Sequence, residues 1–290
     1  MPPEPSFLDN WAFWLEAMVA SVAAGIGLGG LGVWVALKRV VYVPLAVSQV
    51  AAVGVVIAFL IEEFLLGDGE SVMHALCEPS VLALVLAVAS AFYFARPQGG
   101  GERATGVAWV AGGAAVLLLG SLVRTDIHDV QGILFGNAVL VERSQMWTTV
   151  AVLGVVAAVH GLWYRRFLYV SFDPVSAAAA GFHVYRHEVL LYATFALMIS
   201  AATRVLGALP AFGLTLLPAL AVLALRLGMR TSVALAAGLG GLSAGLGYYL
   251  SFRYDLPTGA TMVAVGMVWL GLTNVLARVM RRGGRTAEVG

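Results

Sequence analysis

Charged residues are scarce in this sequence. Of its 290 residues, only 11% are Asp, Glu, Lys or Arg, whereas 60% are apolar. A soluble globular domain carries roughly a quarter charged residues, and this charge covers its hydrated surface. The low charge therefore excludes an ordinary soluble domain and indicates a protein surface that faces lipid. The net charge of +1 gives no indication of a nucleic-acid partner.

Cysteine and lysine are each present only once. A single Cys77 cannot form an internal disulfide, and it excludes a cysteine-clustered metal site. The phosphate-binding loop of P-loop ATPases needs a lysine directly after a glycine, but the only lysine, Lys38, follows a leucine. The metalloprotease pattern His-Glu-x-x-His is also absent. We therefore expect this chain to hydrolyse no nucleotide by itself and to hold no cofactor, and these absences argue against an enzyme.

Long apolar stretches fill most of the sequence. A helix that spans a bilayer needs about 20 apolar residues, and nine stretches reach or approach that length. They predict an all-α fold, a polytopic transmembrane bundle of eight or nine spans that forms one domain over residues 1–290. Pro210 and Pro218 interrupt the seventh stretch, which can therefore be a broken or re-entrant helix. The predicted spans are residues 11–37, 40–60, 79–95, 104–123, 146–162, 188–206, 212–225, 231–250 and 259–277.

The basic residues predict the orientation of the bundle. With the N-terminus outside, 13 of the 17 Lys and Arg residues lie in loops and a tail on the cytoplasmic side, as the positive-inside rule requires. The C-terminus is then cytoplasmic and ends in a basic tail, residues 279–290. Twelve of the 16 acidic residues lie at or near the outer boundary. They either simply complement the basic inner side or create a field that concentrates cations at an entrance. The first apolar stretch is too long for a cleavable signal peptide, so we expect it to be retained.

Few ionisable residues fall within the predicted spans, where each is a candidate for function because its burial in lipid is costly. His160 lies near the cytoplasmic end of its span, and we expect it to form a hydrogen bond there rather than bind metal. Asp126, His128 and Asp129 combine carboxylate and imidazole groups on the acidic side, so they are candidate metal ligands. Residues of these types in a loop are also commonly solvated, and both interpretations stay open.

Three stretches, taken in order, resemble one protein family. The first, residues 129–141, reads Asp-Val-Gln-Gly-Ile-Leu-Phe-Gly-Asn-Ala-Val-Leu-Val. The second, residues 173–181, reads Asp-Pro-Val-Ser-Ala-Ala-Ala-Ala-Gly. The third reads Arg-Val-Leu-Gly-Ala-Leu-Pro at 204–210 and Leu-Leu-Pro-Ala at 216–219, and resumes as Leu-Pro-Thr-Gly at 256–259. Together they resemble the membrane permease subunit of ABC importers for zinc, manganese and iron, over most of the chain.

The resemblance implies a permease in the bacterial plasma membrane. It would act as a homodimer with a separate ATPase subunit that binds ATP, and with an external protein that delivers the metal. Residues 171–187 would include the coupling helix that contacts the ATPase, with Asp173, Pro174, Ser176, Ala177 and Gly181 in it. The residue types agree, because Asp173 can cap a helix whose first residue is Pro174 and Gly181 can end it. An ordinary capped loop helix would show the same features.

The predicted cargo pathway departs from the family pattern. Such permeases show a Tyr, then an Asp, and then a Ser-His pair that ends four residues after the Asp. Here Tyr42 and Ser48 match, but Leu45 replaces the Asp and Gln49 replaces the His. Leucine offers no metal ligand, and an amide is a poorer ligand than imidazole or carboxylate. The cargo is therefore either a divalent metal ion carried without that site, or a metal chelate or other small solute. A third alternative is a stand-alone secondary transporter or a membrane scaffold, without any ATPase.

Overall fold

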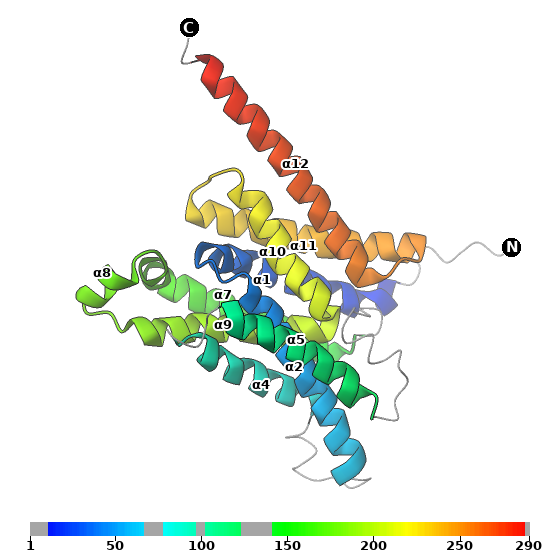
Figure 1. Ribbon diagram of the computed structural model, residues 1–290. Helices are drawn as coiled ribbons and strands as arrows, with labels where there is room; N and C mark the ends of the chain where they lie inside the picture. The colour runs from blue at the N-terminus through cyan, green and yellow to red at the C-terminus, as the bar shows by residue number, and fades with distance from the viewer. Residues whose placement is uncertain (1–10, 67–77, 97–101, 123–140, 288–290) are drawn as a thin grey trace, which may run out of the picture.

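The computed structural model describes residues 11–66, 78–96, 102–122 and 141–287, and these residues form helices and turns without any strand (Figure 1). The expected all-α bundle is therefore confirmed. The helices are α1 (Trp11–Leu37), α2 (Tyr42–Ile61), η1 (Glu62–Leu66), α4 (Pro79–Phe94), α5 (Glu102–Gly120), α7 (Arg143–Phe172), α8 (Pro174–Ala179), α9 (Val184–Leu206), α10 (Ala208–Leu223), α11 (Met229–Tyr254) and α12 (Thr258–Ala287).

Each of the nine predicted spans corresponds to a helix. By length and composition, seven helices among the described residues can cross a membrane, while those at residues 81–94 and 208–223 are shorter. The largest differences are in α7 and α12, and α7 continues ten residues past its predicted end at residue 162. Likewise α12 continues to Ala287, so most of the basic tail is helical. Hydropathy marks the apolar part of a helix and not its polar ends, which explains both differences.

The seventh apolar stretch is one continuous helix, α10, and not a broken one. Pro210 is the third residue of α10, where its missing N–H has no partner within the helix in any case. Pro218 lies inside α10 and is buried. The helix continues through it because α10 packs against α1, α11 and α12, whose contacts hold it in place. Two prolines therefore did not suffice to predict a break.

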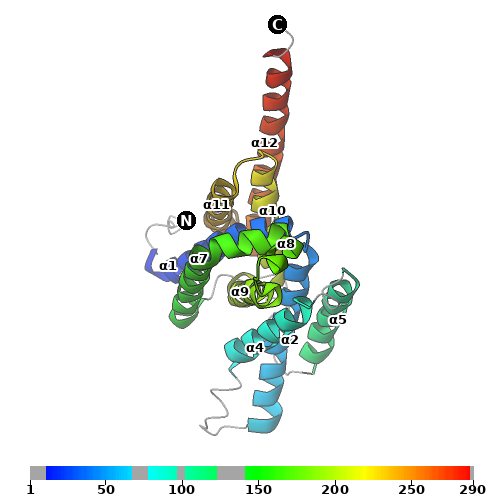
Figure 2. The same cartoon turned by 90° about the vertical axis from the view of Figure 1, so that its left-hand side faces the viewer.

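Helix α1 lies at the centre of the bundle and packs against α7, α9, α10 and α11 (Figures 1 and 2). Small residues allow its close approach to α11. A Cβ built on Gly29 would overlap the carbonyl oxygen of Ala236, and one built on Gly240 would overlap that of Gly25. Packing of this kind holds membrane helices together, because lipid gives no hydrophobic driving force between them.

Helix α11 carries Gly-Leu-Ser-Ala-Gly at residues 241–245, which matches the nucleophile pattern of α/β-hydrolases. That pattern needs a serine on a sharp turn between a strand and a helix. Ser243 instead lies within α11, is buried, and donates a hydrogen bond to the carbonyl oxygen of Leu239 at 2.7 Å. The match therefore reflects helix packing and not hydrolysis.

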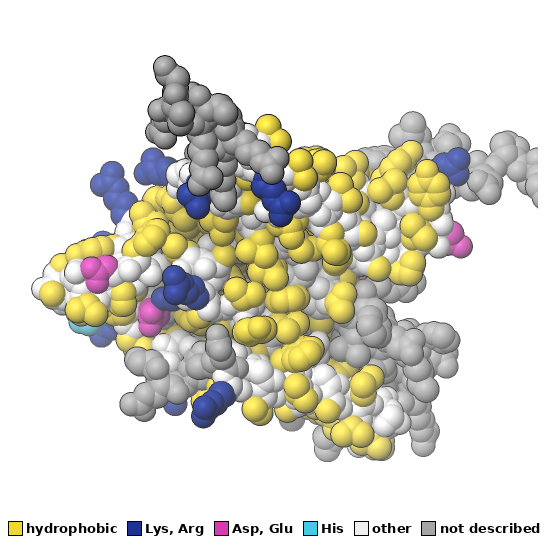
Figure 3. All heavy atoms as spheres, turned by 45° about the horizontal axis from the view of Figure 1, so that its top comes forward, with side chains coloured by type: hydrophobic (Ala, Val, Ile, Leu, Met, Phe, Trp, Pro, Cys, Tyr) yellow, Lys and Arg dark blue, Asp and Glu magenta, His cyan; other side chains and the backbone are white. Residues whose placement is uncertain are grey.

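The two ends of the bundle differ. The short helix α8 projects from one end, here called the α8 end, where α1 finishes and α2 and α9 begin (Figures 1 and 2). Figure 3 shows one face with hydrophobic side chains across its middle and most of its visible Lys and Arg side chains toward the α8 end. The α8 end is the one that the basic residues assign to the cytoplasm, and this orientation stays a prediction.

Candidate functional site

The predicted pathway residues form a stripe on the first turns of α2. Tyr42, Leu45 and Gln49 are three and four residues apart, so they share one face of the helix. The stripe runs inward from the α8 end, from Tyr42, which is 54% exposed, to Gln49, which is 8% exposed. Ser48 is fully buried beside it, and its hydroxyl donates to the carbonyl oxygen of Leu45 at 2.9 Å.

Helix α5 covers the inner end of this stripe. A Cβ built on Gly112 would lie 2.9 Å from the Cβ of Gln49, and one built on Gly113 would lie 3.7 Å from its Oε1. Among the described residues, the buried Oε1 of Gln49 has no hydrogen-bond partner. The glycine pair therefore lets α5 pack directly against Gln49, whose amide oxygen can still accept a hydrogen bond or bind a cation. The glycine pair was missed from sequence, although two adjacent glycines within an apolar span were the available signal.

The oxygen atoms of the stripe and of Ser48 beside it are neutral, and they come from a phenol, a hydroxyl and an amide. Within the described ranges, no three His, Cys, Asp or Glu side chains come together closely enough to hold a metal ion. The candidate ligands Asp126, His128 and Asp129 lie outside the described residues. The stripe can therefore contact a passing cation or a polar solute but offers no charged ligand of its own.

The predicted coupling helix has the expected caps. The carboxylate of Asp173 accepts a hydrogen bond from the backbone N–H of Ser176 at 2.9 Å, and Pro174 is the first residue of α8. Hydrogen bonds from the side chain and backbone of Ser176 lower the pKa of Asp173, so the cap stays ionised at neutral pH. Gly181 follows the helix with φ of 84°, a left-handed conformation that glycine adopts without strain.

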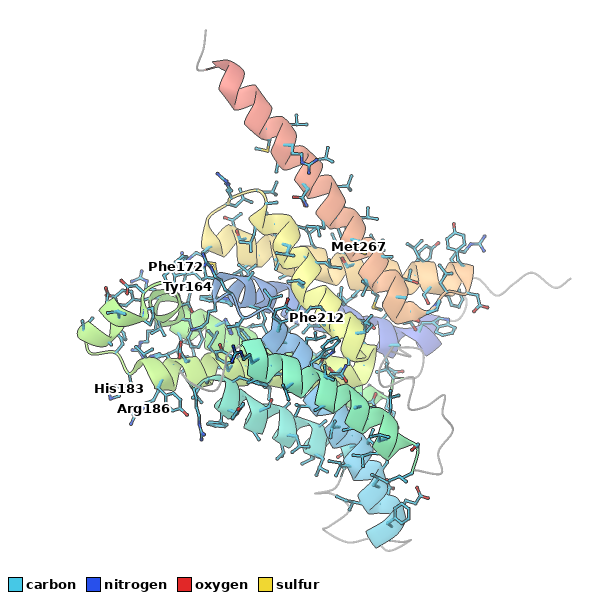
Figure 4. The ribbon with its side chains drawn as sticks, viewed as in Figure 1. Tyr164, Phe172, His183, Arg186, Phe212 and Met267 are labelled. Carbon is cyan, nitrogen blue, oxygen red and sulfur yellow. The ribbon has the colours of Figure 1, made fainter. Side chains whose placement is uncertain are left out.

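The coupling segment is fixed to the bundle on one side and exposed on the other. Ala177 is fully buried, and the ring of Phe182 lies 5.7 Å from that of Tyr169 and 6.1 Å from that of His187. In contrast, Val175 is 79% exposed and Phe172 is 63% exposed. Figure 4 shows Phe172 at the α8 end, together with His183 and Arg186. The segment therefore presents apolar and basic side chains on a small, capped projection, as a docking element would.

His160 forms the hydrogen bond that we expected. Its Nε2 lies 3.0 Å from the hydroxyl of Thr194, and its ring packs against those of Trp34 and Phe167. Elsewhere in the bundle, a cavity of about 210 Å³ lies between α4, α7 and α9, and its lining combines apolar side chains with the polar Gln145, Ser200 and Arg204. Neither place includes a residue of the α2 stripe or of the coupling segment.

Comparison with known protein sequences gives a match over nearly the whole chain. The sequence model of the ABC 3 transport family matches residues 10–276. The chain is 27% identical over 261 residues to the manganese transport system membrane protein MntC of Listeria monocytogenes, covering 90% of this chain and 89% of that protein. It is 24% identical over 277 residues to the manganese import system permease protein ScaB of Streptococcus parasanguinis, covering 95% and 94% of the two chains.

Solved structures show the same fold. A chain of PsaBC from Streptococcus pneumoniae in complex with Fab superimposes with a TM-score of 0.78 at 19% identity, covering 92% of both chains. An inward-facing conformation of a putative metal-chelate type ABC transporter gives a TM-score of 0.66 at 15% identity, covering 92% of this chain and 89% of that chain. At these identities the likeness establishes the fold alone.

Proposed function

Because this chain belongs to the ABC 3 transport family, we propose that it is the transmembrane permease of an ABC importer for a divalent metal ion, with manganese first among zinc, manganese and iron. The family match over residues 10–276 carries the proposal. It confirms the resemblance of the three stretches, and it does not favour a stand-alone transporter or scaffold. The relatives named for manganese transport, which the chain matches along most of their length, support manganese as the cargo.

The permease would work with other subunits. ATP would be bound and hydrolysed by a separate ATPase, so the chain itself needs no cofactor. An external binding protein would deliver the metal, and two copies of the chain would enclose the pathway. The exposed, capped α8 with Val175, together with Phe172 at the end of α7, is the surface best suited to contact the ATPase, since it projects from the end assigned to the cytoplasm.

The chemistry of the α2 stripe supports manganese over zinc. Zinc is held best by thiolate and imidazole, whereas manganese accepts oxygen ligands and water. Gln49, Ser48 and Tyr42 supply only neutral oxygens near the stripe. A partly hydrated Mn²⁺ ion could pass them without being trapped, because no charged ligand binds it tightly.

A second candidate cargo is a metal chelate. Leu45 lies in the stripe where the family pattern has a carboxylate, and Gln49 where it has an imidazole. A chelate brings its own ligands and presents a polar outer surface, so it would need hydrogen bonds from the pathway and not metal coordination.

The first test of the proposed function is composition of the purified complex. We expect mass spectrometry of the gently solubilised protein, expressed in its own host, to identify a P-loop ATPase in equal amount and an external binding protein. Reconstituted in vesicles, this complex should take up Mn²⁺ only when ATP is present. Repeated purification without any ATPase, under conditions that preserve other ABC complexes, would contradict the proposal.

The double variant Leu45→Asp/Gln49→His separates the two cargoes. A metal-ion importer should keep ATP-driven Mn²⁺ uptake and change its preference among Mn²⁺, Zn²⁺ and Fe²⁺, because the variant adds two good ligands. A chelate importer should lose uptake, because the added charge and ring occupy a site shaped for hydrogen bonds. The matched control, Leu45→Ala/Gln49→Ala, alters the same side chains without adding a ligand. Uptake should be measured with each metal ion alone and with excess chelator.

A further inference from the structure

A partly buried ion pair joins two distant segments at the α8 end. The Nζ of Lys38 lies 2.6 Å from Oε1 of Glu188, and the two side chains are only 9% and 19% exposed. Lys38 is the only lysine of the chain, and its partner is 150 residues away in the sequence. Removing one member of such a pair leaves the other charge buried without compensation. The pair therefore holds the end of α1 firmly to the start of α9.

On one side, the pair is connected to the coupling segment. Glu188 lies in the second turn of α9, which begins at Val184, after a turn of four residues that follows α8. The turn is closed by hydrogen bonds from Phe182 N to the Ala177 carbonyl and from Gly181 N to the Ala178 carbonyl, both at 3.0 Å. Contact of the Phe182 ring with His187 adds a link from this turn to α9. A displacement of α8 must therefore also displace the first turns of α9.

On the other side, the pair is connected to α2. Helix α1 ends in a tight turn, with hydrogen bonds from Arg39 N to the Ala36 carbonyl and from Val40 N to the Val35 carbonyl, both at 3.1 Å. This is the Schellman arrangement, with Arg39 in the left-handed conformation at φ of 58°. Helix α2 begins three residues later, at Tyr42. A short, hydrogen-bonded turn is stiff, so movement of Lys38 is passed to the first turn of α2.

We propose that the Lys38–Glu188 pair is the link through which movement of α8 reaches α2 and the stripe of Tyr42, Leu45 and Gln49. The inference rests on the proposed function, because it assumes that an ATPase moves α8. Lys38 and Glu188 are positioning residues, which act through the helix that lines the pathway. Helix α9 also packs directly against α1 and α2, so without the pair the movement of α2 with α8 and the start of α9 would be weakened.

The test uses the complex of the full chain with its ATPase and binding protein in proteoliposomes, with Mn²⁺ as the probe. Mn²⁺ uptake and ATP hydrolysis are measured in the same vesicles. We expect Lys38→Met and Glu188→Gln each to lower the Mn²⁺ transported per ATP by about tenfold, with ATP hydrolysis in the absence of binding protein unchanged. Lys38→Arg, which keeps the charge, should retain the ratio. The exchanged pair Lys38→Glu/Glu188→Lys should restore most of it.

Controls separate the link from a purely stabilising contact. Arg278→Met removes an exposed cation of α12, predicted to lie on the same side of the membrane, and should leave the ratio unchanged. If the pair only stabilised the fold, its loss would lower the melting temperature, Mn²⁺ uptake and ATP hydrolysis together. The Mn²⁺ transported per ATP would then stay unchanged, and this result would overturn the proposal. If the wild-type complex shows no ATP-driven Mn²⁺ uptake, the proposed function fails and the link with it. If the wild type transports but Lys38→Met keeps its ratio, only the link fails.

Discussion

Gly240→Leu is expected to prevent assembly of the bundle. A Cβ at this position would overlap the carbonyl oxygen of Gly25 on the central helix α1, so the backbones of α1 and α11 would have to separate. Overpacking of a close interface costs about 3 kcal/mol or more when backbone must move, which corresponds to a fall in melting temperature of roughly 10 °C for a chain of this size. We expect little monodisperse protein in detergent, as measured by size-exclusion chromatography, and a lowered melting temperature in what remains.

Gly238→Leu is the matched control for this variant. Gly238 lies two residues earlier in α11, and a Cβ built there has no atom within 4 Å. The same substitution on the same helix should therefore leave yield and melting temperature nearly unchanged. Equal behaviour of the two variants would show that the close approach of α1 and α11 does not hold the bundle together.

Gly181→Val is expected to abolish ATP-driven uptake while leaving insertion and the bundle intact. Space is not the constraint, because a Cβ at Gly181 would have no atom within 4 Å. The constraint is its φ of 84°, a left-handed conformation that costs a side-chain-bearing residue about 1–2 kcal/mol and a β-branched one more. Valine should open the turn after α8 and release Phe182 from Tyr169. The measurement is Mn²⁺ uptake per ATP hydrolysed, together with the yield of folded protein.

Two controls test this explanation. Asn adopts the left-handed conformation more easily than other residues, so Gly181→Asn should retain most of the transport activity. Gly161→Val places the same bulk on the exposed face of α7, where the backbone is helical and a Cβ has no neighbour within 4 Å, and should have little effect. Full activity of Gly181→Val would argue against a role of this turn in coupling. Equal loss in the valine and asparagine variants would point to bulk at the docking surface and not to φ.

Several features could be read from sequence because their physical causes are local. The apolar stretches predict helices from hydropathy and length alone, and the prediction for α1 coincides with its observed bounds. The caps of α8 depend on residues within a few positions of one another, so Asp173, Pro174 and Gly181 could be assigned in advance. The order of the three short sequence stretches was sufficient to indicate the family that the chain resembles. That Tyr42, Leu45 and Gln49 share one face of α2 likewise follows from helical spacing.

Other features were decided by tertiary structure. Whether α10 breaks at Pro218 depends on the helices that pack around it, and the sequence alone left this question open. The contact of Gly112 with Gln49 and the pairing of Lys38 with Glu188 join residues from helices far apart in the chain. In lipid, helices associate through close packing and a few polar contacts. Hydropathy and periodicity therefore determine that these helices form, whereas only the shapes of their assembled surfaces determine which side chains meet.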